Sequence, residues 1–177
     1  MNITVYLGAY EGNDKSIRDA VRELGTWIGK SRNTLVYGGS KIGLMGVLAE
    51  SVIHSGGKAI GVEPQFLIDQ VVQYDQLTEL IVTENMSQRK AKMIELGDAF
   101  IALPGGTGTL EEISEIMSNV SLRLIDAPCI IYNHNGYYDN LKQQLATMIE
   151  IGLSSEERQA GICFADSIEQ IKCILSE

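Results

Sequence analysis

The sequence predicts an α/β protein with a doubly wound, mainly parallel sheet and helices on both faces. Short apolar runs alternate with helix-length amphipathic stretches along the chain, and several of these runs are apolar on both sides. Strands that are apolar on both sides belong to a sheet buried between helical layers, and regular βα alternation with right-handed crossovers makes such a sheet parallel. We therefore expect a ligand site beyond the carboxyl ends of the strands, where the strand order changes direction.

Seven apolar runs of four or five residues are the expected strands. They cover residues 3–7, 34–37, 58–62, 79–82, 99–103, 129–132 and 162–165. Two helices are predicted by apolar stripes that would face the sheet. The stripes are Ile17, Ala20, Val21, Leu24 and Ile28, and then Leu110, Ile113, Ile116, Met117, Val120 and Leu124. Because no composition break, low-complexity tract or internal repeat occurs, residues 1–177 are expected to form a single domain.

The composition is that of a folded globular protein. Of the 177 residues, 45% are hydrophobic and 21% charged, which excludes disorder and a fibrous repeat. The net charge of −9 disfavours nucleic acid as a partner, because duplex binding depends on neutralising phosphates.

No apolar run approaches the ~20 residues of a membrane span and no positive charge precedes Lys15, so we expect a cytoplasmic protein without a membrane segment. With two histidines and no C-x-x-C pair, no metal site is expected.

Three predicted strands run directly into glycine-rich loops, at residues 8–12, 38–43 and 104–109. The last two loops lead directly into predicted helices. Loops without side chains let backbone N–H groups approach a phosphate, and a helix N-terminus adds unpaired donors and the positive end of a dipole. One such loop can equally be a tight turn without a ligand. Two of them at the same sheet edge favour a bound anion.

Known phosphate and nucleophile motifs are incomplete in this chain. A P-loop is excluded because Leu24 stands where it needs a glycine, five residues before the Gly-Lys-Ser run at 29–31. The dinucleotide fingerprint G-x-G-x-x-G is incomplete, because a match that begins at Gly106 has Glu111 where the third glycine is required. A nucleophile elbow fails because Ile42 replaces its last glycine. ATP hydrolysis of the P-loop type, NAD binding and serine hydrolysis are therefore disfavoured.

A helix expected from about Ser87 to Leu96 carries an arginine on its apolar stripe. The stripe consists of Met86, Arg89, Met93 and Leu96. A desolvated guanidinium is costly unless an anion meets it, so a partly buried Arg89 implies a nearby carboxylate or ligand phosphate. The alternative is that Arg89 extends along its stem to solvent.

Glu112 also has two interpretations. The run from Thr109 to Glu112 reads T-x-x-E, a capping box in which Glu112 binds the backbone N–H of Thr109, and the spacing favours this role. On the other hand, Glu111 and Glu112 form an acidic pair that would repel a phosphate in the adjacent loop. Carboxylates at this place need a reason beyond capping, because other residues cap a helix equally well.

These segments together resemble the LOG ("lonely guy") family of cytokinin riboside 5′-monophosphate phosphoribohydrolases, often labelled lysine decarboxylase-like. The resemblance spans nearly the whole chain. The residues that carry it are Val36-Tyr37-Gly38-Gly39 with Gly43-Leu44-Met45-Gly46, Arg89-Lys90 with Met93, and Pro104 to Glu112, which matches the family's PGGxGTxxE.

The resemblance implies a Rossmann-like homodimer that hydrolyses the N-glycosidic bond of a purine nucleoside 5′-monophosphate to free base and ribose 5-phosphate, and no cofactor is expected. It makes Arg89 and Glu112 the catalytic pair. Substrate-contacting positions are Lys90, Gly105, Gly106, Thr107, Gly108, Thr109 and Glu111, and the residues that shape the neighbouring loop are Gly38, Gly39 and Gly43. A decarboxylase is disfavoured because none of the 8 lysines lies in an obviously apolar setting for a Schiff base.

The chain departs from the family pattern in several places, among them the stretch of Ser87 and Gln88, which lacks a common histidine, and Ile125 to Ala127, which lacks a His-x-Lys. Gly8-Ala9-Tyr10 replaces a Gly-Ser-Ser-like loop, Ser40 replaces the third glycine of YGGG, and the stretch after Glu112 lacks the usual Trp-x-Gln-Leu-Gly. The loop at Gly8-Ala9-Tyr10 lacks the family's hydroxyl contacts, and we expect the changed stretch after Glu112 to affect base recognition or the dimer contact, so AMP is a candidate substrate beside cytokinin ribotides. A non-catalytic carrier of a nucleotide or of the molybdenum cofactor is the alternative function, because one fold can serve both roles.

Overall fold

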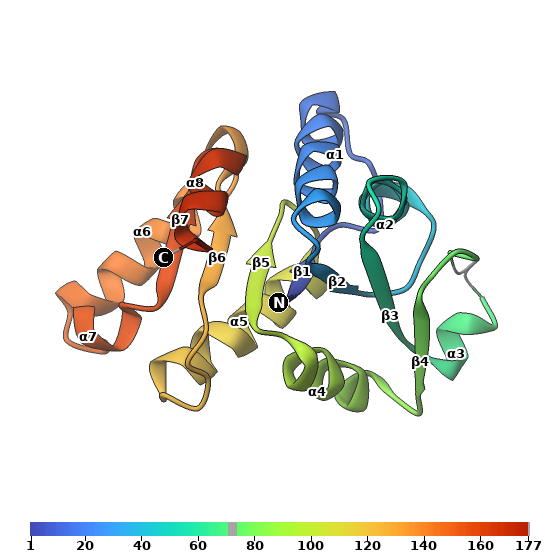
Figure 1. Ribbon diagram of the computed structural model, residues 1–177. Coiled ribbons are helices and arrows are strands. Elements are labelled where there is room, and N and C mark those ends of the chain that lie inside the picture. The colour runs from blue at the N-terminus through green and yellow to red at the C-terminus, as the bar shows by residue number, and fades with distance from the viewer. Residues whose placement is uncertain (71–73, 177) are drawn as a thin grey trace.

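The computed structural model describes residues 1–70 and 74–176. Within them, seven strands pair in parallel as one sheet of order β4-β3-β2-β1-β5-β6-β7 (Figure 1). The strands are β1 (Asn2–Tyr6), β2 (Thr34–Tyr37), β3 (Lys58–Pro64), β4 (Glu79–Thr83), β5 (Ala99–Ala102), β6 (Cys129–Tyr132) and β7 (Ile162–Ala165). From β1 the chain builds outward to β4 and then returns to build outward from β5 on the other side. The predicted doubly wound sheet is confirmed.

Helices cover both faces of the sheet. They are α1 (Lys15–Lys30), α2 (Gly43–His54), α3 (Gln65–Ile68), α4 (Met86–Leu96), α5 (Thr107–Ser121), the short 3₁₀ helix η1 (His134–Gly136), α6 (Asp139–Glu150), α7 (Glu156–Gln159) and α8 (Ile168–Ile174). One core layer contains side chains of α1, α2 and α8, and the other contains side chains of α4, α5 and α6 (Figure 1). In the described residues, no helix has the length and apolarity that a membrane span requires.

The strands occur at the predicted places, with shifts of one or two residues at their ends. The second predicted helical stripe is wrong at both its ends. Leu110 is 45% exposed, because the first turn of α5 lies beyond the carboxyl end of β5. Leu124 is 72% exposed, because α5 ends at Ser121 and the chain leaves the sheet through the positive φ of Arg123. The middle of the stripe is buried as expected.

Close backbone packing between α1 and α2 places the start of α2 near the end of β1. Gly25 and Gly29 lie on the buried side of α1, where a Cβ atom would come within 2.8 Å and 2.5 Å of backbone carbonyl oxygens of α2. At the start of α2, Gly43 has a φ of +60°, and a Cβ there would lie 2.0 Å from the carbonyl oxygen of Ala9. The loops that follow β1 and β2 are therefore in direct contact.

Replacing Gly29 by alanine should destabilise the fold, although alanine favours helices. The gain in helix propensity is at most about 1 kcal/mol, whereas overpacking a tight contact costs about 1–3 kcal/mol. Because the added Cβ would meet a backbone atom, Val52 O, which cannot move aside, the cost lies at the upper end of that range. We expect a net loss of about 1–2 kcal/mol in the free energy of unfolding, measured by urea denaturation. Lys30 is an exposed residue in the same turn, so Lys30→Ala should change the free energy of unfolding by less than about 0.5 kcal/mol. An unchanged or higher stability of Gly29→Ala would contradict the packing described here.

Candidate functional site

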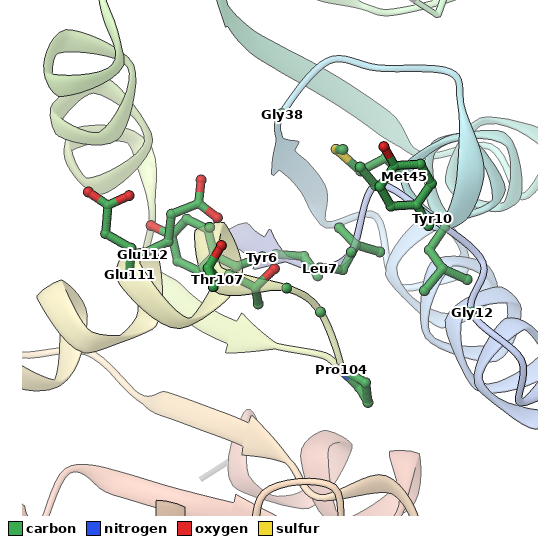
Figure 2. Close-up of a pocket in the computed structure, with 18 of the residues that line it drawn as sticks. Tyr6, Leu7, Tyr10, Gly12, Gly38, Met45, Pro104, Thr107, Glu111 and Glu112 are labelled. Carbon is green, nitrogen blue, oxygen red and sulfur yellow. The ribbon is translucent and has the colours of Figure 1, made fainter.

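A pocket of about 450 Å³ opens at the carboxyl ends of β1 and β5, where the strand order changes direction. Its walls are the loops after β1, β2 and β5, the first turns of α2 and α5, and side chains of α4 (Figure 2). This volume lies within the range of small-molecule sites. The pocket occupies the place at which a doubly wound sheet holds its ligand.

The turn from Pro104 to Thr109 forms one wall of the pocket and leads into α5. Gly105 has no room for a side chain, because a Cβ there would lie 2.2 Å from Thr109 Oγ1 and 2.8 Å from the backbone nitrogen of Gly8. Gly106 is the N-cap of α5 and no side chain caps the helix. The N–H groups of the first turn have no acceptor within the helix, so they are available to an anion in the pocket.

Arg89 and Glu112 form a buried ion pair between α4 and α5. Arg89 Nη1 lies 2.7 Å from Glu112 Oε1, and both side chains are about one-tenth exposed. Arg89 Nε donates a 3.0 Å hydrogen bond to the carbonyl oxygen of Val62, at the carboxyl end of β3. A Cβ at Gly38 would lie 2.5 Å from Arg89 Nη2, so a side chain there would displace the guanidinium from its present place.

Both simpler interpretations of this pair are wrong. Arg89 does not extend to solvent, because it is only 8% exposed and its guanidinium meets a carboxylate and a carbonyl. The capping box does not form, because α5 begins at Thr107, two residues before its threonine. Glu112 therefore lies in the second turn, on the buried side that faces α4.

The structure brings most of the predicted site residues together around the pocket. Those that line it are Gly38, Arg89, Gly105, Gly106, Thr107, Gly108, Thr109, Glu111 and Glu112. Three others lie behind its walls. Gly39 packs against Glu63, Gly43 packs against the carbonyl of Ala9, and Lys90 Nζ binds Glu111 at 2.8 Å and Glu115 at 3.0 Å. These three shape the walls from outside the cavity.

Sequence reasoning missed two pocket tyrosines. Tyr6 is the last residue of β1 and lies beside Glu112 in Figure 2, on the same wall of the pocket. Because Tyr6 lies within an apolar strand, the sequence pattern around it predicts only that it is buried. Tyr137 follows β6 and donates its hydroxyl to the carbonyl oxygen of Gly105. The signal that could have identified it is its position just after a strand, at the sheet edge where the glycine loops lie.

Comparison with known proteins decides the family. Residues 45–173 match a family described as "Possible lysine decarboxylase". The cytokinin riboside 5′-monophosphate phosphoribohydrolase of Rhodococcoides fascians is 45% identical over 138 residues, which are 77% of this chain and 70% of that protein. The Arabidopsis thaliana enzyme of the same name, LOG1, is 38% identical over 96% of this chain and 79% of its own length. The chain belongs to the LOG family.

Solved structures share the fold of this LOG-family protein. The molybdenum cofactor binding protein of Rippkaea orientalis superposes with a TM-score of 0.72 at 25% identity, over 98% of this chain and 96% of that one. The molybdenum cofactor carrier protein of Chlamydomonas reinhardtii superposes with a TM-score of 0.71 at 19% identity, over 99% and 98% of the two chains. The second likeness concerns the fold alone.

The family description is not matched by the residues of the pocket. Pyridoxal-dependent decarboxylation needs a lysine that forms a Schiff base with its cofactor. Among the described residues that line the pocket of this LOG-family protein, none is a lysine. Lys90, the nearest lysine on α4, is engaged by two carboxylates, whose hydrogen bonds raise its pKa. A raised pKa keeps the amine protonated and therefore non-nucleophilic.

Burial and the ion pair act in opposite directions on Glu112. Burial raises the pKa of its carboxyl group, while the charge of Arg89 and its hydrogen bond lower it. Burial also raises the pKa of the Tyr6 phenol, and the negative charge of Glu112 adds to this effect. A proton on the carboxyl group of Glu112 is therefore less costly than at the surface, and Arg89 is what maintains the ionised form.

In the part of the chain that the structure describes, no group of three or more His, Cys, Asp or Glu side chains is arranged to hold a metal ion.

Removing the guanidinium should produce a pH-dependent loss of stability. We expect Arg89→Met to lower the free energy of unfolding by about 3 kcal/mol at pH 7, because Glu112 is left buried without its partner. Its folded pKa then lies further above the unfolded value, so the folded state binds more protons and the loss shrinks as the pH falls through the folded pKa. Urea denaturation between pH 5 and pH 8 measures this dependence.

The double variant Arg89→Met with Glu112→Gln is the control for this measurement. It carries no buried carboxylate, so it should be more stable than Arg89→Met at pH 7 and lose the added pH dependence. If the stability deficit of Arg89→Met were independent of pH, the ion pair would not hold Glu112 ionised.

Proposed function

We propose that this protein is a nucleoside 5′-monophosphate phosphoribohydrolase. It cleaves the N-glycosidic bond of a purine ribotide, of the cytokinin type or AMP, to release free base and ribose 5-phosphate. The observation that carries the proposal is the buried pair of Arg89 and Glu112 beside an uncapped helix start in one pocket. The printed activity of the relatives from Rhodococcoides fascians and Arabidopsis thaliana supports it.

The proposed mechanism divides the pocket between phosphate and ribose. The N–H groups of Gly105 to Thr109 bind the 5′-phosphate, because a helix start attracts an anion. Cleavage proceeds through an oxocarbenium-like transition state, in which the bond between the anomeric carbon and the base nitrogen breaks and its electron pair leaves with the base. Glu112 stabilises the positive charge on the ribose and orients the water that attacks the anomeric carbon, and the proton that the water loses is taken up by the departing base. Arg89 holds Glu112 ionised and in place.

The residues around this centre have supporting roles. Gly38 leaves the space for the guanidinium of Arg89, and Gly39 and Gly43 shape the loop after β2 in which Gly38 lies. Glu111 lines the pocket and is held by Lys90 through a 2.8 Å contact. We propose that this second ion pair contacts the ribotide while limiting the repulsion between Glu111 and the phosphate.

A non-catalytic carrier is the second candidate function. It is favoured by the shared fold with the Rippkaea orientalis protein, which is 25% identical and binds molybdenum cofactor. Because one fold can host either role, the decision depends on the site. In a carrier, the glycine turns would bind a phosphate group and Glu112 would be a structural partner of Arg89.

One assay separates the two functions. The purified protein is incubated with AMP and with an isopentenyladenine ribotide, and free base is measured by chromatography. Release of adenine or isopentenyladenine supports the hydrolase, and the ratio of the two rates defines its base preference. Tight binding of a ribotide without release of base would favour the carrier.

Glu112→Gln should abolish most of the turnover without unfolding the protein. The amide keeps the size and a hydrogen-bond acceptor for Arg89 but removes the negative charge, so we expect kcat to fall by roughly 10²- to 10⁴-fold. Circular dichroism monitors the fold. Glu95→Gln is the matched control, because Glu95 is an exposed residue of α4 that pairs only with Lys92 among the described residues. A Glu112→Gln enzyme with kcat near that of the unchanged protein would refute the catalytic role.

We further propose that the protein acts as a homodimer. Large apolar side chains are exposed near the two ends of α5, and such surfaces commonly mark contacts with another chain. They are Leu110, Leu122 and Leu124. Light scattering should report about twice the 19.4 kDa of the chain. Leu124→Glu should shift the mass toward the monomer, and a monomeric mass for the unchanged protein would contradict the proposal.

A further inference from the structure

Three successive backbone carbonyls at the end of β5 each accept a hydrogen bond from another segment of the chain. The carbonyl of Leu103 accepts one from the hydroxyl of Tyr138 at 2.9 Å, and that of Pro104 accepts one from the N–H of Gly8 at 3.3 Å. The carbonyl of Gly105 accepts one from the hydroxyl of Tyr137. A carbonyl oxygen carries partial negative charge and repels an anion. Here each of the three is engaged by a donor, which reduces that repulsion and holds the turn in one orientation.

Tyr137 and Tyr138 are fixed by the turn that follows β6. Asn133 is 6% exposed, and its side-chain oxygen accepts a 2.7 Å hydrogen bond from the N–H of Tyr138. The N–H of Tyr137 donates to the carbonyl of His134 at 3.0 Å. The two tyrosine rings meet edge to face, with their centroids 4.8 Å apart. The ring of Tyr137 therefore has a defined place, although it is 52% exposed.

The hydroxyl groups of Tyr137 and Tyr138 make their hydrogen bonds for different reasons. Tyr138 is 6% exposed and belongs to the hydrophobic core, so its hydroxyl needs a partner simply because it is buried. The hydroxyl of Tyr137 lies at the pocket, where water is available, and yet it binds the carbonyl of Gly105. That carbonyl belongs to the residue before Gly106, the N-cap of α5, so it shares a peptide unit with the N–H of Gly106.

We propose that Tyr137 is a positioning residue that orients the Gly105 turn for a phosphate monoester. The inference rests on the proposed function for the identity of the ligand. By holding the Gly105 carbonyl, Tyr137 sets the plane of the peptide that joins Gly105 to Gly106, and with it the direction of the next N–H group. Its hydroxyl bonds to the turn, whereas Arg89 and Glu112 bond to each other. Its loss should weaken phosphate binding and leave the bond-breaking step intact.

The test compares Tyr137→Phe with the unchanged protein by calorimetric titration with ribose 5-phosphate and by steady-state kinetics with AMP. Removing one hydrogen bond from the turn should raise the Kd for ribose 5-phosphate and the KM by roughly fivefold. kcat should change by less than about twofold, because the interaction removed is uniform between the ground state and the transition state. The melting temperature should be retained, because the hydroxyl is at the pocket surface. Tyr74→Phe, the same change on a part-exposed tyrosine outside the pocket, should leave Kd, KM and kcat unchanged.

The outcomes separate this inference from the proposed function. If Tyr137→Phe binds ribose 5-phosphate as tightly as the unchanged protein, or loses kcat with KM unchanged, Tyr137 does not position the turn. If the unchanged protein binds ribose 5-phosphate but releases no base from any purine ribotide, the hydrolase proposal fails, and the two Kd values still decide the role of Tyr137. If the unchanged protein does not bind ribose 5-phosphate, the turn is not a phosphate site and the inference falls.

Discussion

The buried ion pair between Arg89 and Glu112 is the interaction around which the site is organised. Two desolvated charges can be held together only if the remaining donors and acceptors are also satisfied. The structure meets this requirement with the carbonyl of Val62, which accepts from Arg89 Nε, and with a glycine at position 38, which leaves room for Nη2. Segments from β2, β3, α4 and α5 are thereby fixed relative to one another at one point of the sheet edge.

The change in strand order explains why this point is also a pocket. The chain leaves β1 toward one side of the sheet and β5 toward the other, so the loops after these adjacent strands diverge. The space between them is bounded by glycines that let backbone approach backbone. The close contact of Gly8 with Gly105, and of Gly43 with Ala9, brings the loops after β1, β2 and β5 to the same cavity. An acidic protein can therefore offer an anion a local set of N–H donors.

The electrostatics of the pocket are balanced by pairing. Three carboxylates and two cations of α4 and α5 lie close to the expected phosphate site, and a free carboxylate there would repel the ligand. Arg89 engages Glu112, and Lys90 engages both Glu111 and Glu115. The second pair is more exposed, with Lys90 18% and Glu111 62% exposed at the side chain, so solvent screens it more strongly. The buried pair is therefore the one whose charge state responds most to a change in either partner.

Sequence patterns were enough to predict the fold class, the places of the strands and the candidate residues of the glycine turns. Two-sided apolar runs and helical stripes are local patterns, and a doubly wound sheet follows from them through general rules of connection. Local patterns left the roles of Arg89 and Glu112 open, since a stripe arginine can reach solvent and T-x-x-E can cap a helix. The packing of α4 against α5 resolved both alternatives, because it brings residues 23 positions apart to a 2.7 Å contact. Tyr137 reaches the Gly105 turn from 32 positions away, and no spacing along the chain indicates that contact. Burial and partnership arise only when elements pack together, whereas a sequence pattern reports only which face of one element is apolar.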